Sequence, residues 1–271
     1  MNAALRRLAA AIAIGAAAVL AAGCQSTPST PSVPATPIPL PPVKQPEVSP
    51  QERANLHAEL GAGYYERGQM DIALQELKEA AALDPNNPRI YNYFGLVYAM
   101  LGENAQAEQN FRRALSLAPQ DSDIRHNWGW FLCSTGRARE SIPEFELALR
   151  NPLYRTPEVA LVNAGRCSMS YGDNAAAESF FRRAQALAPN NVGANYGLAL
   201  IAYRAGRQDE ATSLLKRLMQ QPTPNAEVLY LGMCIDRRGG DKVGEASYAA
   251  QLRSRFPDSA ETKAIATGSC Q

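Results

Sequence analysis

Hydrophobic and small residues recur along this chain with a spacing of 34 residues. The matched positions in the first two copies are Gly61 and Gly95, Ala73 and Ala107, Leu77 and Phe111, Ala80 and Ala114, and Pro85 and Pro119. Within each copy the apolar positions follow a helical period on either side of a glycine, Gly68 or Gly102, that ends the first helix. The pattern therefore predicts a helix, a short turn and a second helix, repeated along the chain.

This unit has the features of the tetratricopeptide repeat (TPR). Small residues at places eight and twenty allow the two helices to approach closely, and large residues at places four, seven, eleven and twenty-four fill the space between them. We predict an all-α TPR solenoid of about six helix-turn-helix repeats over residues 51–258, followed by a C-terminal tail over residues 259–271. The expected repeats are 54–87, 88–121, 122–157, 158–191, 192–224 and 225–258, the third with two inserted residues near 151–157.

The N-terminus has the pattern of a bacterial lipoprotein signal. Two arginines precede an uncharged apolar run from Leu8 to Leu20, which has the length of a signal-peptide core and is short for a membrane span. Small residues then lead to Cys24, whose thiol we expect to carry lipid after residues 1–23 are removed. Several acyl chains give stable anchoring where a single chain is marginal. The alternative for this segment is an N-terminal transmembrane anchor.

Residues 24–50 are expected to form a lipidated, disordered linker. Nine of the 19 prolines of the chain lie between residues 25 and 50, and such a segment favours an extended polyproline II conformation. We interpret it as a tether between the membrane and the solenoid; a proline-rich ligand for another domain is the less favoured alternative. Gln25 stands where an aspartate would resemble an inner-membrane retention signal, so the expected location is the outer membrane, facing the periplasm.

Composition and charge exclude several classes of function. Lys plus Arg number 27 against 26 Asp plus Glu, so no basic surplus points to nucleic acid. His57 and His126 are expected as polar residues on helix faces, and no zinc, phosphate-binding or nucleophile motif accompanies them. We therefore expect no enzyme activity, no cofactor, no metal site and no small-molecule substrate.

Four cysteines lie outside the lipidation motif, and an even number in an oxidising compartment suggests disulfides. Cys133 and Cys167 lie at places twelve and ten of consecutive first helices, which pack side by side in a TPR array, so their thiols could meet. Cys234 lies on the last first helix, and only Cys270 in the tail is left to reach it. Free thiols are the alternative for both pairs.

The first helices of a TPR array line a concave surface that binds partner proteins. Places two, five, nine, twelve and thirteen of each first helix face this surface. Four apolar or aromatic residues at such places in the first three repeats are expected to form an exposed partner site, namely Tyr65, Leu96, Met100 and Trp130. A helix or strand with apolar anchors is the expected ligand. The alternative is that these residues pack against the neighbouring repeat.

Several stretches of the chain resemble one family of TPR proteins. The sequences ELGAGYYERGQMDIALQEL and IYNYFGLVYAMLGENAQAEQNFRRALSLAPQDS are similar to the type IV pilus biogenesis lipoproteins of the PilF/PilW (pilotin) family, and HNWGWFLCSTGR (126–137) and NPLYRTPEVALVNAGRC (151–167) resemble it more specifically. The resemblance extends over about residues 52–256. The paired cysteines of the family correspond to Cys133 and Cys167, whereas the long proline-rich linker and Cys270 are not associated with it.

The resemblance implies an outer-membrane lipoprotein that binds the secretin of the type IV pilus and promotes the localisation and multimer assembly of that secretin, which pilus formation and twitching motility require. The implied partners are the secretin multimer and, through the lipid, the outer membrane. Two other classes stay open as hypotheses. One is a lipoprotein adaptor that brings envelope proteases or cell-wall enzymes together, and the other, less favoured, is an enzyme.

Overall fold

The computed structural model describes residues 48–268 and Cys270, and this part of the chain contains helices joined by turns, with no strand. The helices are α1 (Pro50–Glu66), α2 (Met70–Leu83), α3 (Pro88–Met100), α4 (Asn104–Leu117), α5 (Ser122–Ser134), α6 (Ala138–Leu149), α7 (Pro157–Ser170), α8 (Asn174–Leu187), α9 (Val192–Arg204), α10 (Gln208–Leu218), α11 (Ala226–Gly239), α12 (Lys242–Arg255) and α13 (Ala260–Thr267). The prediction of an all-α TPR solenoid is confirmed. The predicted signal peptide, Cys24 and most of the predicted linker lie outside the described residues.

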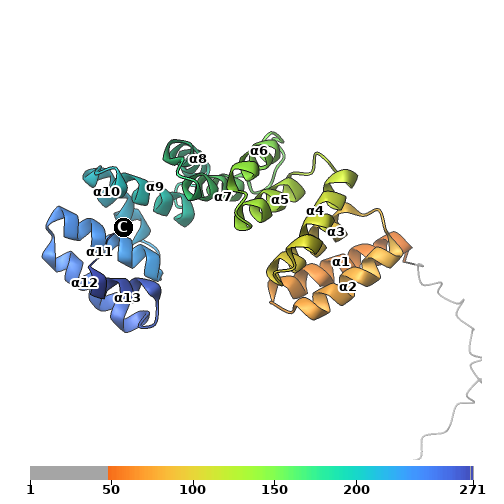
Figure 1. The fold of residues 1–271 in the computed structure, drawn as a ribbon, viewed down its shortest axis with the longest axis horizontal. Coiled ribbons are helices and arrows are strands. Elements are labelled where there is room, and N and C mark those ends of the chain that lie inside the picture. Colours follow the sequence, from red (N-terminus) through yellow and green to blue (C-terminus); the bar gives the residue numbers. More distant parts are fainter. Residues whose placement is uncertain (1–47, 269, 271) are drawn as a thin grey trace, which may run out of the picture. The chain divides into compact units, whose positions relative to one another are not determined.

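The first twelve helices form six pairs that follow one another in chain order (Figure 1). In each pair the first helix packs along the second helix. Each first helix also contacts the first helix of the next pair, whereas the second helices of successive pairs are not in close backbone contact within the described part of the chain. We call α1, α3, α5, α7, α9 and α11 the first-helix layer, and it is the layer that the sequence assigned to partner binding.

The close approach within a pair depends on a small residue in the first helix that faces a large residue in the second. A Cβ atom added at Gly95 would lie 2.8 Å from the Phe111 ring, and one added at Gly165 would lie 2.6 Å from the Phe181 ring. Both phenylalanines are fully buried. Since these distances are far below a van der Waals contact, these two helix pairs can keep their present separation only with glycine at place eight.

The turn between the two helices of a pair ends at a glycine in the left-handed region of backbone conformation. Gly68 has φ 74° and Gly102 has φ 77°, values that residues with a Cβ atom rarely adopt. The same conformation follows the first helix of the other four pairs, at Gly136, Gly172, Gly206 and Gly240. Asparagine or aspartate caps most first helices, for example Asn87 at α3 and Asp121 at α5.

Two segments without a repeat pattern take defined positions. The insertion between α6 and α7 carries Tyr154, whose side chain is buried and reaches His126 of α5. The C-terminal tail contains α13, which packs on both α11 and α12. The 34-residue period predicted that the second helix of the last repeat is the last helix of the solenoid, whereas in the structure a further helix, α13, follows it.

Candidate protein-binding surface

The structure separates the four residues that the sequence grouped as a partner site. Met100, in the last turn of α3, is 55% exposed and projects into solvent. Tyr65 and Trp130 are partly buried, and each packs against two clusters of core residues. Leu96 is only 8% exposed and belongs to the core cluster that contains Phe111.

The expectation that Leu96 is exposed is therefore wrong. Its side chain shares a core cluster with Phe131 and Leu132 of α5, so it packs against the following repeat, as the alternative interpretation proposed. Consecutive first helices approach closely enough at this place to enclose a leucine. Of the four predicted residues, only Met100 and the exposed parts of Tyr65 and Trp130 therefore face solvent, so the predicted partner site is smaller than expected.

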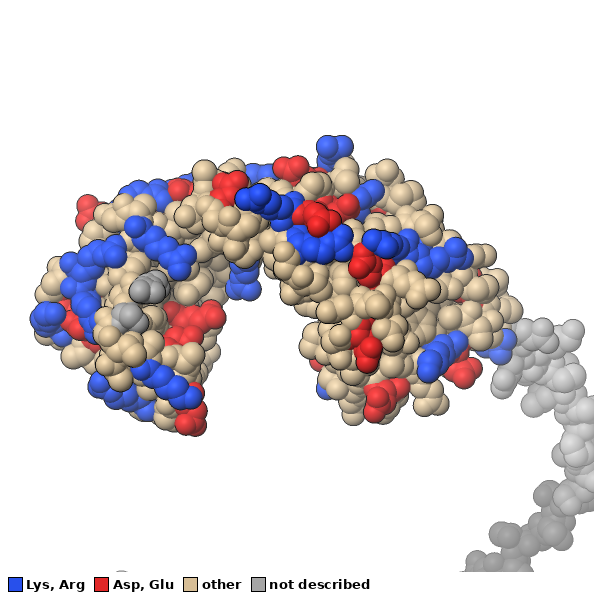
Figure 2. Space-filling model, in the orientation of Figure 1, with Lys and Arg blue, Asp and Glu red and all other residues tan. Residues whose placement is uncertain are grey.

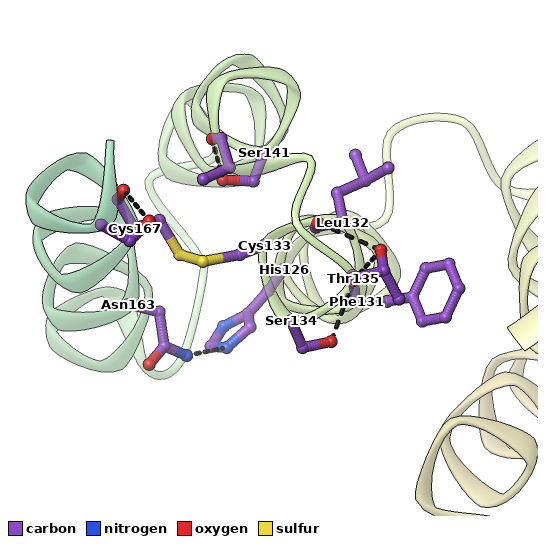
Figure 3. The surroundings of a disulfide bond; sticks show 11 residues. His126, Phe131, Leu132, Cys133, Ser134, Thr135, Ser141, Asn163 and Cys167 are labelled. Atoms are coloured by element: carbon purple, nitrogen blue, oxygen red, sulfur yellow. Dashed lines mark hydrogen bonds between the residues drawn. A yellow bond between two sulfur atoms is a disulfide. The ribbon is translucent and has the colours of Figure 1, made fainter. Parts of the chain in front are cut away.

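Two disulfides join first helices to later segments of the chain. Cys133 of α5 is bonded to Cys167 of α7, with the Cα atoms 5.8 Å apart, and Figure 3 shows the two side chains pointing toward each other. Cys234 of α11 is bonded to Cys270, which follows α13, with the Cα atoms 5.6 Å apart. The first bond crosses the boundary between repeats three and four, and the second attaches the C-terminal segment to the last first helix.

A partly buried polar network lies beside the first disulfide (Figure 3). The amide of Asn163 on α7 donates to Nε2 of His126 at 2.9 Å, which places the imidazole proton on Nδ1, and Nδ1 donates to the hydroxyl of Tyr154 at 2.5 Å. Burial lowers the pKa of His126 to about 4, so the ring is neutral at pH 7. The sequence placed His126 on a polar helix face, but the side chain connects two repeats from within.

We predict that His126 makes the protein less stable at mildly acidic pH. In the unfolded chain this histidine takes up a proton near pH 6.5, whereas in the folded protein it stays neutral down to about pH 4. Stability therefore decreases as the pH falls below 6.5, by at most about 1.4 kcal/mol per pH unit, and the decrease levels off near pH 4.

Urea unfolding at pH 7.0 and pH 5.0 measures this effect. The His126→Gln variant should lose much of the pH dependence, and His57→Gln, measured in parallel, shows how far the other histidine contributes. Equal pH dependence in the wild-type chain and in His126→Gln would contradict the prediction.

A cavity of about 240 Å³ opens between α7 and α9, in the first-helix layer of repeats four and five. Its lining is mostly apolar and includes Met169, Phe181, Tyr196 and Leu200, with Arg166 and Ser170 as its polar members. Apart from Phe181, which comes from α8, these residues occupy places five, nine, twelve and thirteen of their first helices. They are therefore on the surface that the sequence assigned to partner binding, but outside the three repeats from which the partner site was chosen.

Two glycines, Gly193 and Gly197, form part of the cavity wall at places two and six of α9. A Cβ atom added at Gly193 would lie 2.8 Å from Val162 of α7, and one added at Gly197 would lie 2.4 Å from the Phe181 ring. The bare backbone of α9 therefore packs directly on its neighbours. At place six the other first helices carry side chains, namely Glu59, Tyr93, Asn127, Asn163 and Tyr230. This difference between repeats is the sequence signal that could have located the cavity.

Charged side chains on the second-helix side connect successive repeats. Arg137, which precedes α6, contacts Glu108 of α4 at 3.0 Å, and Arg207, which precedes α10, contacts Glu178 of α8 at 2.8 Å. Figure 2 shows basic and acidic side chains interspersed on the visible face of the repeats. Within residues 48–268, no group of three or more His, Cys, Asp or Glu side chains could hold a metal ion, and no helix is both long and apolar enough to cross a membrane.

Three TPR models match the chain. One described as a TPR repeat covers residues 61–102, and two described as tetratricopeptide repeats cover residues 88–121 and 168–231. Each match falls on the helix pairs described above. These comparisons agree with the repeat architecture.

A more specific likeness is to the crystal structure of PilW, a widely conserved type IV pilus biogenesis factor. The two chains are 31% identical and superimpose with a TM-score of 0.72, and the alignment covers 79% of this chain and 98% of PilW. The chain belongs to the PilF/PilW family of type IV pilus biogenesis proteins. The alignment spans almost all of PilW, so the likeness is not limited to one repeat.

A second member of the PilF/PilW family gives the same result. The type IV pilus assembly protein PilF of Pseudomonas aeruginosa is 25% identical over 210 residues, which are 78% of this chain and 83% of that protein. The solved structure of Pseudomonas aeruginosa PilF has the same fold, with a TM-score of 0.74 at 24% identity over 81% of this chain and 99% of that chain. This chain is thus a TPR protein homologous to pilus biogenesis factors, and TPR proteins of this kind act through protein partners.

Proposed function

We propose that this protein is lipid-anchored at the outer membrane, binds the secretin of the type IV pilus, and promotes its localisation and multimer assembly, so that pilus formation and twitching motility depend on it. The observation that carries the proposal is the likeness to PilW along 98% of that biogenesis factor. PilF of Pseudomonas aeruginosa, a type IV pilus assembly protein, supports it. The first-helix layer supplies the surface for a protein partner, since TPR arrays bind partners on this side.

Deletion of the gene tests the proposal directly. Without the protein, the secretin should run as monomer on a denaturing gel and twitching should stop, and the wild-type gene should restore both. A deletion strain with normal secretin multimers and normal pili would contradict the proposal and favour an adaptor that brings envelope proteases or cell-wall enzymes together.

The membrane anchor is tested by a single substitution. Cys24→Ser removes the thiol that accepts the lipid, and we predict that the variant folds normally but appears in the soluble periplasmic fraction, because the solenoid itself needs no membrane. Circular dichroism of the purified variant is the control for folding. A Cys24→Ser protein that stays with the outer membrane would contradict lipid anchoring at this residue.

The secretin contact is tested at Met100 and not at Leu96, because Met100 is exposed and Leu96 is buried. Met100→Glu should change the free energy of unfolding by no more than about 0.5 kcal/mol, since the side chain is exposed. It should weaken secretin binding by about 1 kcal/mol or more, since a bound partner would remove the new carboxylate from water without giving it a counter-charge.

Leu153→Glu is the matched control, because Leu153 is an apolar residue that is 83% exposed in the loop before α7. Pull-down of the secretin should be reduced by Met100→Glu and unchanged by Leu153→Glu. Capture at the wild-type level by a folded Met100→Glu protein would place the secretin contact away from repeats one to three.

A further inference from the structure

We propose that the cavity between α7 and α9 binds an extended peptide segment of a partner protein, which inserts one aromatic side chain and carries an acidic residue toward α7 and a basic residue toward α11. This would be a second binding site, separate from the surface around Met100. It does not depend on whether the secretin is the partner of the first three repeats.

The size and lining of the cavity suit one aromatic ring. Its volume is about 240 Å³, whereas an apolar cavity of about 150 Å³ already holds benzene. Met169, Phe181 and Tyr196 supply a thioether and two aromatic rings, which make favourable contacts with the faces and edges of an inserted ring. A phenylalanine or tyrosine side chain would therefore fill the space, and an alanine would leave it largely empty.

One guanidinium group without an ion-pair partner lines the cavity, and a second lies at the end of α9. Arg166 of α7 lines it, and Arg204 of α9 acts electrostatically on the Tyr196 hydroxyl. Both side chains are exposed, and neither takes part in an ion pair within residues 48–268. Arginines of the second-helix side, such as Arg137 and Arg207, are by contrast paired with carboxylates. An unpaired guanidinium at the edge of an apolar cavity is suited to bind a carboxylate.

Carboxylates lie on the elements that follow α9 in the packing order, since α11 contacts α9 and α13 contacts α11. The pKa of the Tyr196 phenol is raised to about 12, chiefly by burial and also by the charges of Glu227 of α11 and Glu261 of α13, while Arg204 and Arg166 oppose the shift. No ion pair among the described residues involves either glutamate. The surroundings of the cavity are thus basic toward α7 and α9 and acidic toward α11 and α13. This asymmetry sets the direction of the peptide, because charge complementarity fixes the register of a bound segment.

Synthetic peptides test the proposal on the purified full-length chain. The probe peptide is a ten-residue Gly/Ser sequence with a single Phe, an Asp two residues before it and a Lys two residues after it; a second peptide has Asp and Lys exchanged, and a third has Ala in place of Phe. Fluorescence anisotropy should give a dissociation constant at least about tenfold lower for one of the two Phe peptides than for the Ala peptide, because a buried aromatic anchor dominates such contacts.

Arg166→Glu tests the predicted direction. The substitution should raise the dissociation constant of the preferred peptide by about threefold to fivefold, as expected for a charge pair at the edge of a site. The variant should also bind a peptide with Lys in place of Asp better than the wild-type chain does. Lys78→Glu, at an exposed position of α2, is the matched charge control and should change neither affinity. Ser170→Trp, at the exposed edge of the cavity, should fill it and abolish binding with an unchanged melting temperature.

Two results would overturn the proposal. Equal binding of the Phe and Ala peptides would show that the cavity accepts no aromatic anchor. Equal effects of Arg166→Glu and Lys78→Glu on the preferred peptide would show that the guanidinium of Arg166 does not contact the ligand. Arg166→Glu keeps the test decisive even if Ser170→Trp disturbs folding, because Arg166 is exposed and its replacement removes no ion pair.

Discussion

Replacing both Cys133 and Cys167 with serine is expected to lower the free energy of unfolding by about 3–4 kcal/mol. The disulfide joins residues 34 positions apart and connects α5 to α7 across the boundary between repeats three and four. Without it the unfolded chain gains the conformational freedom of a loop of this length, while the folded chain keeps the contacts of the two helices. Urea unfolding of the purified variant measures the loss, and the amount of protein in cells should fall with it.

The Cys234–Cys270 disulfide provides a matched control. It spans 36 positions, so the chain-entropy effect is nearly the same, but it holds only the C-terminal segment that contains α13. Since α13 has no fully buried residue, its detachment costs the folded state little, and the double serine variant should be clearly more stable than the Cys133/Cys167 variant. Equal losses from the two pairs would contradict this interpretation, and so would thiol labelling that finds Cys133 and Cys167 free in protein taken from the periplasm.

Phe181→Ala is expected to lower the free energy of unfolding by about 3–5 kcal/mol. The ring is fully buried, and it lies so close to the backbones of α7 and α9 that a Cβ atom at Gly165 or Gly197 would collide with it. Removal of the ring therefore leaves a void that rigid backbone on two sides cannot fill. Chemical denaturation of the variant at pH 7 measures the loss.

Phe181→Leu is the control for this prediction, because it keeps most of the volume and should cost roughly 1–1.5 kcal/mol. An alanine variant that loses less than the leucine variant would show that the helices close around the void. The alanine variant also removes one wall of the cavity between α7 and α9, so the proposed peptide should bind it more weakly even where it is fully folded.

The repeat pattern of the sequence determined most of the architecture. Helix periodicity, the glycine that ends each first helix, and the small and large residues at places eight and twenty-four are local or follow from a fixed separation in the chain. Gly95 and Phe111, for example, are 16 residues apart, and a helix, a turn and a second helix of standard length bring them into contact. The same regularity placed Cys133 and Cys167 on adjacent first helices.

The burial of individual side chains on the first helices was decided by the tertiary structure. Leu96 occupies a place that the repeat pattern assigns to the concave surface, yet the following first helix covers it. His126 is partly buried because the two-residue insertion lets Tyr154 reach back to it, and the sequence revealed the insertion but not its direction. Both outcomes depend on how one repeat packs on the next, which is set by side chains from two repeats together.

The cavity between α7 and α9 also depends partly on the sequence pattern and partly on the tertiary packing. The sequence determined that Arg166, Met169, Tyr196 and Leu200 lie on the first-helix layer, because their places in the repeat are fixed by helical periodicity. Only the tertiary structure decided that they enclose a space, because the separation of α7 from α9 depends on the bare backbone at Gly193 and Gly197 and on the Phe181 ring beneath it. Periodicity fixes the direction of a side chain, whereas the distance between helices follows from the volumes packed between them.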